Sequence, residues 1–275
     1  GGDFHQKLEN FQRTGSFKVR GALNKIHALS AGERKAGVVA ASAGNHAQGV
    51  AYAATKAGVQ STIFMPEDAT PAKVVATKGY GAEVRLVGKD YQEAYEAAVA
   101  HQRRTNATFV HAFEDPLVMA GQGTLGLELL QDIPDLECVI VPIGGGGLIA
   151  GVATALKGLK PNIEVIGVQA AGASSIAPSL AKGSAVTLDE ANTMADGIAV
   201  RRSGDMTLEV IKQRVDQVVT VSEPEIAAAI LFLLERSKAV VEGAGAVTLA
   251  AAMHGKVNLS GKKACAIVSG GNIDM

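Results

Sequence analysis

Short runs of Val and Ile alternate along the chain with small-residue turns and Ala-rich stretches of helical periodicity. A buried parallel strand has this continuous apolar character, and a helix usually leads from it to the next strand. The first series predicts strands at 37–41, 61–65, 83–87 and 108–110, with a helix after each of the first three. The second series predicts strands at 139–142, 164–169, 216–221 and 263–269, and helices near 148–157, 206–214, 225–236 and 245–253. The pattern therefore predicts an α/β fold with two doubly wound lobes and mainly parallel sheets.

The composition agrees with such a fold and excludes some partners. Of the 275 residues 47% are hydrophobic but only 4% aromatic, so Ala, Val, Ile and Leu must form the core. The formal net charge of -1 offers no basic excess for a polynucleotide, so we expect no nucleic-acid partner. Both cysteines, Cys138 and Cys265, lie in apolar runs and are expected to be buried thiols of a cytosolic protein.

No apolar stretch approaches the roughly 20 residues of a membrane span, so we expect a cytoplasmic protein that has no membrane partner. A strand-like segment at 4–8 begins almost at once, and Met275 directly follows a glycine-rich loop. We therefore expect the natural chain to extend beyond both ends.

Four consecutive glycines, Gly144, Gly145, Gly146 and Gly147, follow one predicted strand and precede a predicted helix. Successive amides at a helix N-terminus form a nest for an anion, which favours a phosphate site. Two alternatives stay open: a tight turn for close packing, and a dinucleotide fingerprint from Gly145 to Ala150. Against the dinucleotide, the next strand ends at Gln169, where a ribose-binding acid is expected.

Seven short motifs follow one another along the chain. They are Lys7-Leu8-Glu9-Asn10, Gly15-Ser16-Phe17-Lys18-Val19-Arg20-Gly21-Ala22, Ser42-Ala43-Gly44-Asn45-His46-Ala47-Gln48-Gly49, Gly121-Gln122-Gly123-Thr124, the four glycines, Ala195-Asp196-Gly197 and Ser269-Gly270-Gly271-Asn272. Together they resemble the serine/threonine dehydratase (threonine ammonia-lyase) branch of the fold-type II pyridoxal-phosphate enzymes, which also contains serine racemase. The resemblance extends from Lys7 to Asp274. A lone lysine is ordinarily a solvated surface residue, and this context alone makes Lys18 a candidate for chemistry.

The resemblance implies a tryptophan synthase β-like architecture, with a large cofactor-binding domain at 1–36 and 115–275 and a small domain at 37–114. It implies pyridoxal 5'-phosphate as the cofactor, L-threonine and L-serine as substrates, and a homodimer or homotetramer active in amino-acid metabolism, including isoleucine biosynthesis. The reaction expected from it is β-elimination and deamination, which yields 2-oxobutanoate or pyruvate together with ammonia.

The resemblance also assigns roles to individual residues. Lys18 is expected to form the Schiff base and to remove the α-proton, with Ser42 as the second catalytic residue. The cofactor-binding residues implied are Phe17, Lys18, Asn45, Gly144, Gly145, Gly146, Gly147, Leu148, Gly197 and Ser269. The substrate-binding residues implied are Ser42, Ala43, Gly44, Asn45 and His46. Ser269 is expected to give the ring nitrogen an uncharged partner, and Gly197 to lie against the ring. The His46 imidazole is interpreted as a packing group and Arg20 as structural.

Two departures from the serine racemase pattern bear on the reaction. Ala43 replaces the serine that acts on the opposite face of the α-carbon, so we expect elimination and little racemisation. The stretch 169–175 has no carboxylate, so we expect no tight Mg²⁺ or Ca²⁺ site there, although carbonyl groups could hold a monovalent ion. The remaining histidines share no ligand spacing, and no transition-metal site is expected. A dinucleotide-dependent oxidoreductase and a non-catalytic cofactor-binding protein stay open as alternative functions.

Overall fold

The computed structural model describes residues 2–273, which fall into two compact units. The large unit comprises Gly1–Phe17 and Gln122–Met275, and the small unit comprises Lys18–Gly121. Asp274, where the family resemblance ends, lies outside the described residues. The domain limits expected from the sequence place 18–36 and 115–121 differently, and they stay a prediction.

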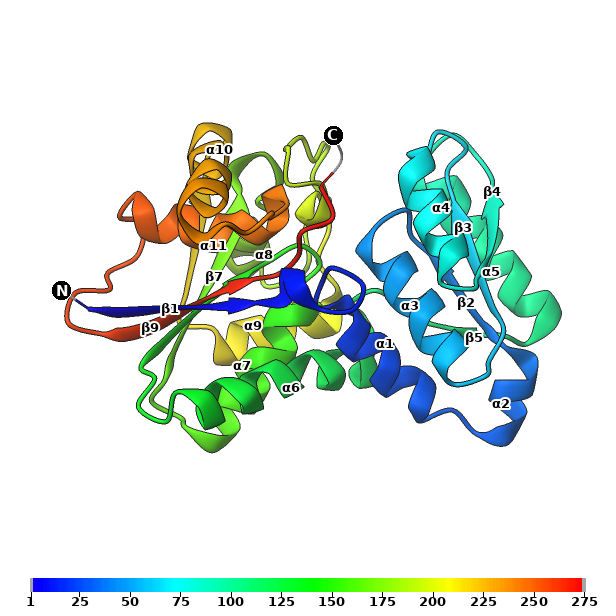
Figure 1. The fold of residues 1–275 in the computed structure, drawn as a ribbon, viewed down its shortest axis with the longest axis horizontal. Coiled ribbons are helices and arrows are strands. Elements are labelled where there is room, and N and C mark those ends of the chain that lie inside the picture. The colour runs from blue at the N-terminus through cyan, green and yellow to red at the C-terminus, as the bar shows by residue number, and fades with distance from the viewer. Residues whose placement is uncertain (1, 274–275) are drawn as a thin grey trace. The chain divides into compact units, whose positions relative to one another are not determined.

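The large unit is built on a parallel sheet whose strands follow the order β1-β9-β6-β7-β8 (Figure 1). The strands are β1 (Asp3–Leu8), β6 (Cys138–Pro142), β7 (Glu164–Ala170), β8 (Gln217–Val221) and β9 (Lys263–Val268). The first and last strands pair in parallel, with Asp3 opposite Lys263 and Leu8 opposite Val268. This pairing joins the beginning and the end of the chain in one sheet.

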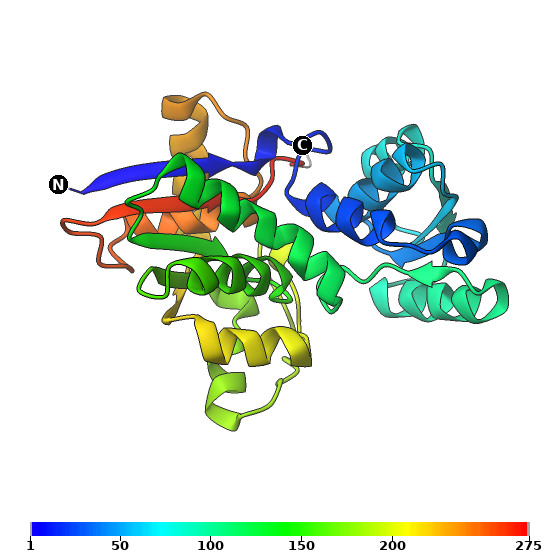
Figure 2. The same ribbon diagram turned by 90° about the horizontal axis from the view of Figure 1, so that it is seen from below.

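Helices cover both faces of this sheet, with α6, α7 and α9 on one side and α10 and α11 on the other (Figure 2). The helices are α6 (Pro116–Asp132), α7 (Gly147–Leu159), α8 (Ile176–Lys182), α9 (Asp205–Arg214), α10 (Glu223–Phe232) and α11 (Gly243–Met253). Residues 116–121 of α6 belong to the small unit. Single turns occur at η1 (Glu9–Phe11), η2 (Ala171–Ala173), η3 (Asp196–Ile198) and η4 (Leu233–Ser237).

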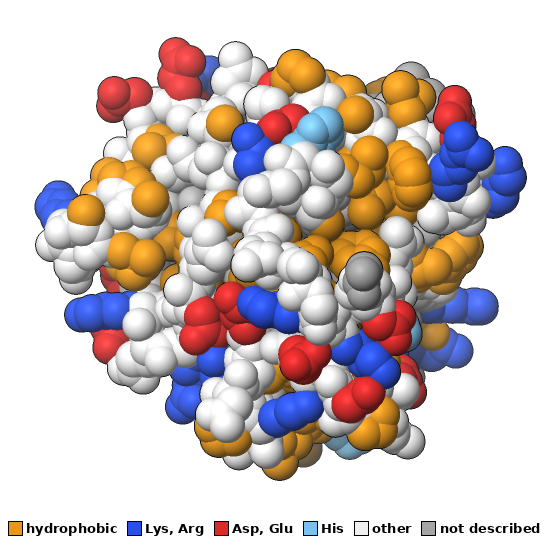
Figure 3. Space-filling model, turned by 90° about the vertical axis from the view of Figure 1, so that its left-hand side faces the viewer, with side chains coloured by type: hydrophobic (Ala, Val, Ile, Leu, Met, Phe, Trp, Pro, Cys, Tyr) orange, Lys and Arg blue, Asp and Glu red, His pale blue; other side chains and the backbone are white. Residues whose placement is uncertain are grey.

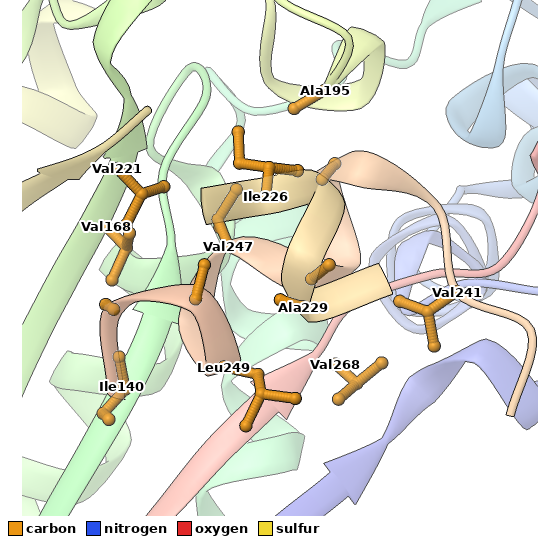
Figure 4. Packing of buried hydrophobic residues seen from close by; sticks show 14 of the residues in the cluster. Ile140, Val168, Ala195, Val221, Ile226, Ala229, Val241, Val247, Leu249 and Val268 are labelled. Atoms are coloured by element: carbon orange, nitrogen blue, oxygen red, sulfur yellow. The ribbon is translucent and has the colours of Figure 1, made fainter. Parts of the chain in front are cut away.

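Side chains alternate between the two faces along each central strand. In β6, Ile140 belongs to the cluster formed with α10 and α11, whereas Val139 and Val141 belong to the cluster formed with α6, α7 and α9. Figure 4 shows Ile140 and Val268 lying around α11 on the first of these faces. Because both faces are buried, both sets of alternate residues are apolar, and the strands appear as continuous hydrophobic runs in the sequence.

The small unit has a second parallel sheet, in the order β4-β3-β2-β5. Its strands are β2 (Val38–Ala41), β3 (Ser61–Met65), β4 (Glu83–Leu86) and β5 (Thr108–Phe109). Its helices are α1 (Lys18–His27), α2 (Ala31–Ala36), α3 (Asn45–Lys56), α4 (Pro71–Gly79) and α5 (Tyr91–Thr105). Val38 and Ala40 pack with α1 and α3, and Val39 and Ala41 pack with α5.

The expected α/β fold with mainly parallel sheets is confirmed. The eight strands of the two predicted series lie within one residue of the observed strands at each end. The helix expected at 225–236 differs, since α10 ends at Phe232 and a π-type turn, Leu233–Ser237, follows. Both cysteines are buried free thiols, and burial raises the pKa of each to about 12.

Acidic and basic side chains are intermixed on the face of the molecule in Figure 3. This distribution agrees with the small net charge and differs from the single-sign surface that polynucleotide binding favours. Among residues 2–273, no helix is both long and apolar enough to cross a membrane.

Candidate active site

Lys18 is the first residue of α1 in the small unit, where it is partly buried. Its Nζ donates a hydrogen bond to the Ala112 carbonyl at 3.5 Å. The backbone of Lys18 is closely packed by α3, because a Cβ at Gly49 would lie 3.1 Å from the Lys18 carbonyl carbon. The lysine expected to carry the chemistry therefore has both its backbone and its amine in contact with defined neighbours.

The loop 42–44 connects β2 to α3 at the carboxyl edge of the small sheet. The Ser42 amide donates to the Phe64 carbonyl at 3.1 Å, and the Gly44 amide donates to Ser42 Oγ at 3.2 Å. Gly44 is the N-cap of α3, so Asn45 and His46 occupy its first turn. Amides in a first turn have no partner within the helix and suit an anion such as a carboxylate. Ala43 packs against the core of the small unit.

His46 is buried, with 4% of its surface exposed. Its Nε2 lies 2.7 Å from the Val110 carbonyl. A carbonyl only accepts, so Nε2 carries the proton, and Nδ1 is left as a buried acceptor with no hydrogen-bond partner. Burial, aided by the positive charge of Lys18, lowers the pKa of His46 to about 3. The imidazole is therefore neutral at physiological pH.

The buried neutral imidazole predicts a specific pH dependence of stability. In the unfolded chain this histidine binds a proton below a pH of about 6.5, whereas in the native state it binds one only below about pH 3. The free energy of unfolding therefore decreases as the pH falls from 6.5 toward 3. Between pH 7 and pH 5 we expect the wild type to lose about 2 kcal/mol more unfolding free energy than His46→Gln. Denaturant titrations at both pH values measure this, and equal losses would show that the native imidazole binds protons.

The four glycines of the large unit form the turn between β6 and α7. Gly146 has φ of +97° at the N-cap, a left-handed conformation that favours glycine. A Cβ at Gly146 would lie 2.8 Å from Thr207 Oγ1. The Thr207 hydroxyl in turn donates to the Gly145 carbonyl at 2.7 Å. Thr207 thus holds one carbonyl of the turn, and the first-turn amides of α7 remain as donors for an anion.

A chain of contacts within the large unit links Gly144, Gly197 and Ser269. A Cβ at Gly144 would lie 3.0 Å from the Ile198 Cα, directly after Gly197. A Cβ at Gly197 would lie 3.0 Å from the Ala244 Cβ, and Ser269 Oγ donates to the Ala244 carbonyl at 3.3 Å. The start of α11 therefore links the Gly197 turn with the end of β9. The packing against Ala244 is by itself a reason for glycine at 197.

Two other cofactor-binding candidates complete this part of the large unit. The Phe17 amide donates to the Ser269 carbonyl at 3.0 Å, and the Phe17 side chain packs against the core. Leu148 is buried in the first turn of α7. The large unit thus brings together Phe17 with Ser269, and Gly197 with Gly144, while the small unit brings together Lys18 and the start of α3.

Gln169 bears on the dinucleotide alternative. It is buried at the end of β7, where Nε2 donates to the Ala173 carbonyl at 3.2 Å and Oε1 accepts from the Ile176 amide at 2.9 Å. The oxygen and the nitrogen of its side-chain amide thus both stabilise the turn before α8. The hypothesis of a dinucleotide site therefore lacks a residue that would bind the ribose. Among the described residues, no group of three or more His, Cys, Asp or Glu side chains could hold a metal ion.

Comparison with known proteins decides the family. Residues 1–270 match the family described as "Pyridoxal-phosphate dependent enzyme". The chain belongs to this family. As a member of it, the protein uses pyridoxal phosphate, and the cofactor expected from the sequence is confirmed.

This family member is similar to proteins of one branch. It is 55% identical over 275 residues to a protein of Thermotoga maritima named L-threonine ammonia-lyase, a match that covers 100% of the chain and 68% of the relative. Among solved structures, threonine deaminase isoform 2 of Solanum lycopersicum has a TM-score of 0.96 and 39% identity, with 100% and 81% of the two chains covered. Maize serine racemase has a TM-score of 0.94 and 39% identity, with 99% and 83% covered.

Sequence reasoning missed three residues that the geometry places beside the candidate site. They are Thr207, which holds the Gly145 carbonyl, Ala112, which accepts from Lys18, and Gly49, which packs on the lysine backbone. Gly49 is the last residue of the motif that begins at Ser42, in which the resemblance assigns roles only to residues 42–46. Thr207 and Ala112 act through tertiary contacts, for which the local sequence holds no signal.

Proposed function

We propose that this pyridoxal-phosphate enzyme is a threonine/serine ammonia-lyase. It converts L-threonine to 2-oxobutanoate and ammonia, and as a secondary activity converts L-serine to pyruvate and ammonia. The observation that carries this proposal is the 55% identity, along the whole chain, to an L-threonine ammonia-lyase. A solved threonine deaminase with a TM-score of 0.96 supports it.

The glycine turn of the large unit fits the phosphate of the cofactor. We assign the backbone amides of 144–147 and of Leu148 to this anion, because a phosphate at a helix N-terminus gains both hydrogen bonds and the helix dipole. The left-handed Gly146 and the close approach of Thr207 leave no room there for a side chain. Thr207 keeps the Gly145 carbonyl oriented toward the Thr207 hydroxyl, which donates a hydrogen bond to it.

In the small unit we assign Lys18 to the covalent bond with the cofactor and to removal of the substrate α-proton. Asn45 would donate a hydrogen bond to the cofactor's phenolic oxygen. Ser42, Ala43, Gly44 and His46 would hold the substrate carboxylate, chiefly through the amides around the start of α3.

Ser269 would be the partner of the ring nitrogen, with Phe17 and Gly197 beside the cofactor. When bound, pyridoxal phosphate supplies a ring that accepts the electrons released with the α-proton. The Ser269 hydroxyl is buried and uncharged, so it would not hold a proton on that nitrogen as a carboxylate would. A moderate electron acceptor favours prompt loss of the β-hydroxyl group, which is the outcome proposed.

The proposal is tested by a substrate panel in which purified protein with added cofactor is incubated with L-threonine, L-serine and bulkier 3-hydroxy-amino acids. We expect equal amounts of 2-oxo acid and ammonia, with threonine preferred. Absence of both products from every substrate would refute the function and favour a non-catalytic cofactor-binding protein.

We also propose a cytoplasmic homodimer or homotetramer, which light scattering of the purified protein would test.

A second candidate is serine racemase, favoured by the similarity to the maize structure. Racemisation needs an acid and a base on opposite faces of the α-carbon, and the methyl group of Ala43 can neither donate nor accept a proton. We therefore expect L-serine to give at least ten times as much pyruvate as D-serine. This excess corresponds to a difference of about 1.4 kcal/mol or more between the two activation barriers. Chiral chromatography alongside a pyruvate assay measures both products.

The variant Ala43→Ser provides the complementary test. It should gain racemisation from a near-zero background, since a hydroxyl then stands at the second face. Comparable amounts of pyruvate and D-serine from the wild type would instead identify a racemase in which another group serves that face.

A further inference from the structure

The segment 110–114 follows β5 in the small unit and contacts the two residues on which the proposed chemistry depends. The Val110 carbonyl accepts from His46 Nε2 at 2.7 Å, and the Ala112 carbonyl accepts from Lys18 Nζ at 3.5 Å. The first contact is short and fully buried, whereas the second is at the upper limit for a hydrogen bond. A small displacement of the segment would therefore remove the contact to the lysine before it broke the contact to His46.

The helix α3 reaches the lysine by a second route. Gly49 lies three residues after His46, so the two share one face of α3. A Cβ at Gly49 would lie 3.1 Å from the Lys18 carbonyl carbon and 3.2 Å from its oxygen. One helix face thus contacts both the backbone of Lys18 and the segment whose carbonyl accepts from its amine.

His111 stabilises the same segment from within. Its Nδ1 accepts from the Phe113 amide at 3.3 Å and from the Glu114 amide at 3.0 Å. Burial lowers the pKa of His111 as it does that of His46, so both imidazoles are neutral at physiological pH. Neither therefore places a positive charge beside Lys18, and each serves as a hydrogen-bonding group of fixed direction.

We propose that His46 is a positioning residue for Lys18. Its Nε2 bond to Val110 fixes the segment 110–112, so that the Ala112 carbonyl receives the amine of Lys18 each time the substrate displaces the lysine. The inference rests on the proposed function, because only a lysine that is released and recaptured in each turnover needs such an acceptor. It gives the imidazole a task separate from that of the His46 amide.

The test compares two replacements in the holoenzyme. His46→Gln retains an amide donor at the position of Nε2, whereas His46→Met has similar length and no donor. His101→Met is the matched control, since His101 lies in α5 and bonds to Arg85 and Arg104. The readouts are kcat and KM for L-threonine, cofactor content, and the rate at which the absorbance of lysine-bound cofactor returns after a small amount of threonine is consumed.

We expect His46→Met to lower kcat and the rate of lysine recapture by roughly 10- to 100-fold, because a displacement of the Lys18 amine by about 1 Å has a cost of this size. The KM should change less than about threefold. His46→Gln should recover most of both rates, and His101→Met should match the wild type. Recapture by His46→Met at the wild-type rate would overturn the proposal, as would equal losses in Gln and Met. A wild type that releases no 2-oxobutanoate would refute the proposed function instead.

A second pair of variants covers the case in which His46→Met fails to fold. Gly49→Ala places a methyl group against the Lys18 peptide, whereas Gly79→Ala in α4 meets nothing within 4 Å. We expect the first to slow lysine recapture more than it changes KM, and the second to have no effect on either. His46 belongs to the same helix, so equal recapture rates in the two variants would show that the placement of α3 against Lys18 does not govern recapture, which would overturn the proposal.

Discussion

Replacement of Lys18 by Ala is expected to lower 2-oxobutanoate release by roughly four orders of magnitude, because one amine provides both the covalent anchor and the base. Alanine is a good helix former, so α1 should persist and the loss should be chemical. Borohydride reduction followed by peptide mass spectrometry measures the anchor directly. The wild type should carry the cofactor on the peptide that contains Lys18, and the variant should carry none.

Lys35 provides the matched control for this variant. It is an exposed lysine of α2 in the same unit, so Lys35→Ala removes a similar amine without touching the candidate site. Its turnover and cofactor attachment should equal those of the wild type. Turnover by Lys18→Ala at the wild-type rate, or cofactor found on a different lysine of the wild type, would show that the assignment is wrong.

The replacement Gly146→Asp is expected to weaken cofactor binding by about 100-fold or more, which corresponds to about 2.7 kcal/mol. A left-handed backbone costs most non-glycine residues about 1 to 2 kcal/mol and Asp less, and the added Cβ would lie 2.8 Å from Thr207 Oγ1. The carboxylate would add repulsion of the phosphate. Titration of cofactor-free protein with pyridoxal phosphate, followed by absorbance, gives the dissociation constant.

Two further variants separate shape from charge at this turn. Gly146→Asn has nearly the same shape as Asp without the charge, so its loss of affinity should be smaller than that of Asp. Gly158→Asp lies in the same helix at a position with nothing within 4 Å of an added Cβ, and it should bind like the wild type. Wild-type affinity in a folded Gly146→Asp protein would place the phosphate elsewhere.

The strands could be predicted closely because a strand that is buried on both faces has a continuous run of apolar residues in the sequence. The helix α6 shows where such reasoning fails, because three glycines at 121, 123 and 126 oppose a helix by about 1 kcal/mol each. A Cβ at Gly123 would lie 2.9 Å from the Gly151 carbonyl oxygen, and one at Gly126 would lie 3.2 Å from the Ala155 Cβ. Close packing on α7 therefore decides the structure of α6, and tertiary packing is invisible to local propensity.

The candidate site could be predicted where side-chain chemistry or glycine conformation is required by the role itself. Gly146, with its positive φ, is an example, and its reason can be stated from the backbone alone. Ala112 is the opposite case, since it contributes only a carbonyl oxygen, which every residue possesses. The sequence favours a packing role for the His46 imidazole and gives no sign of its bond to Val110, because that partner lies 64 positions away.

The pairing of β1 with β9 has a consequence for synthesis on the ribosome. The segment Lys18–Gly121 is continuous, so the small unit has all its strands once that segment has been made, whereas β1 must wait for a partner that is made about 260 residues later. At about 5 to 20 residues per second this delay is roughly 13 to 50 s. The nascent chain exposes β1 during that time and, once residues 138–142 have been made, also the unpaired edge of β6 where β9 will later insert. Nascent-chain chaperones would therefore matter most for the large unit, because a ribosome stalled before residue 263 would hold a large-unit sheet that still lacks β9.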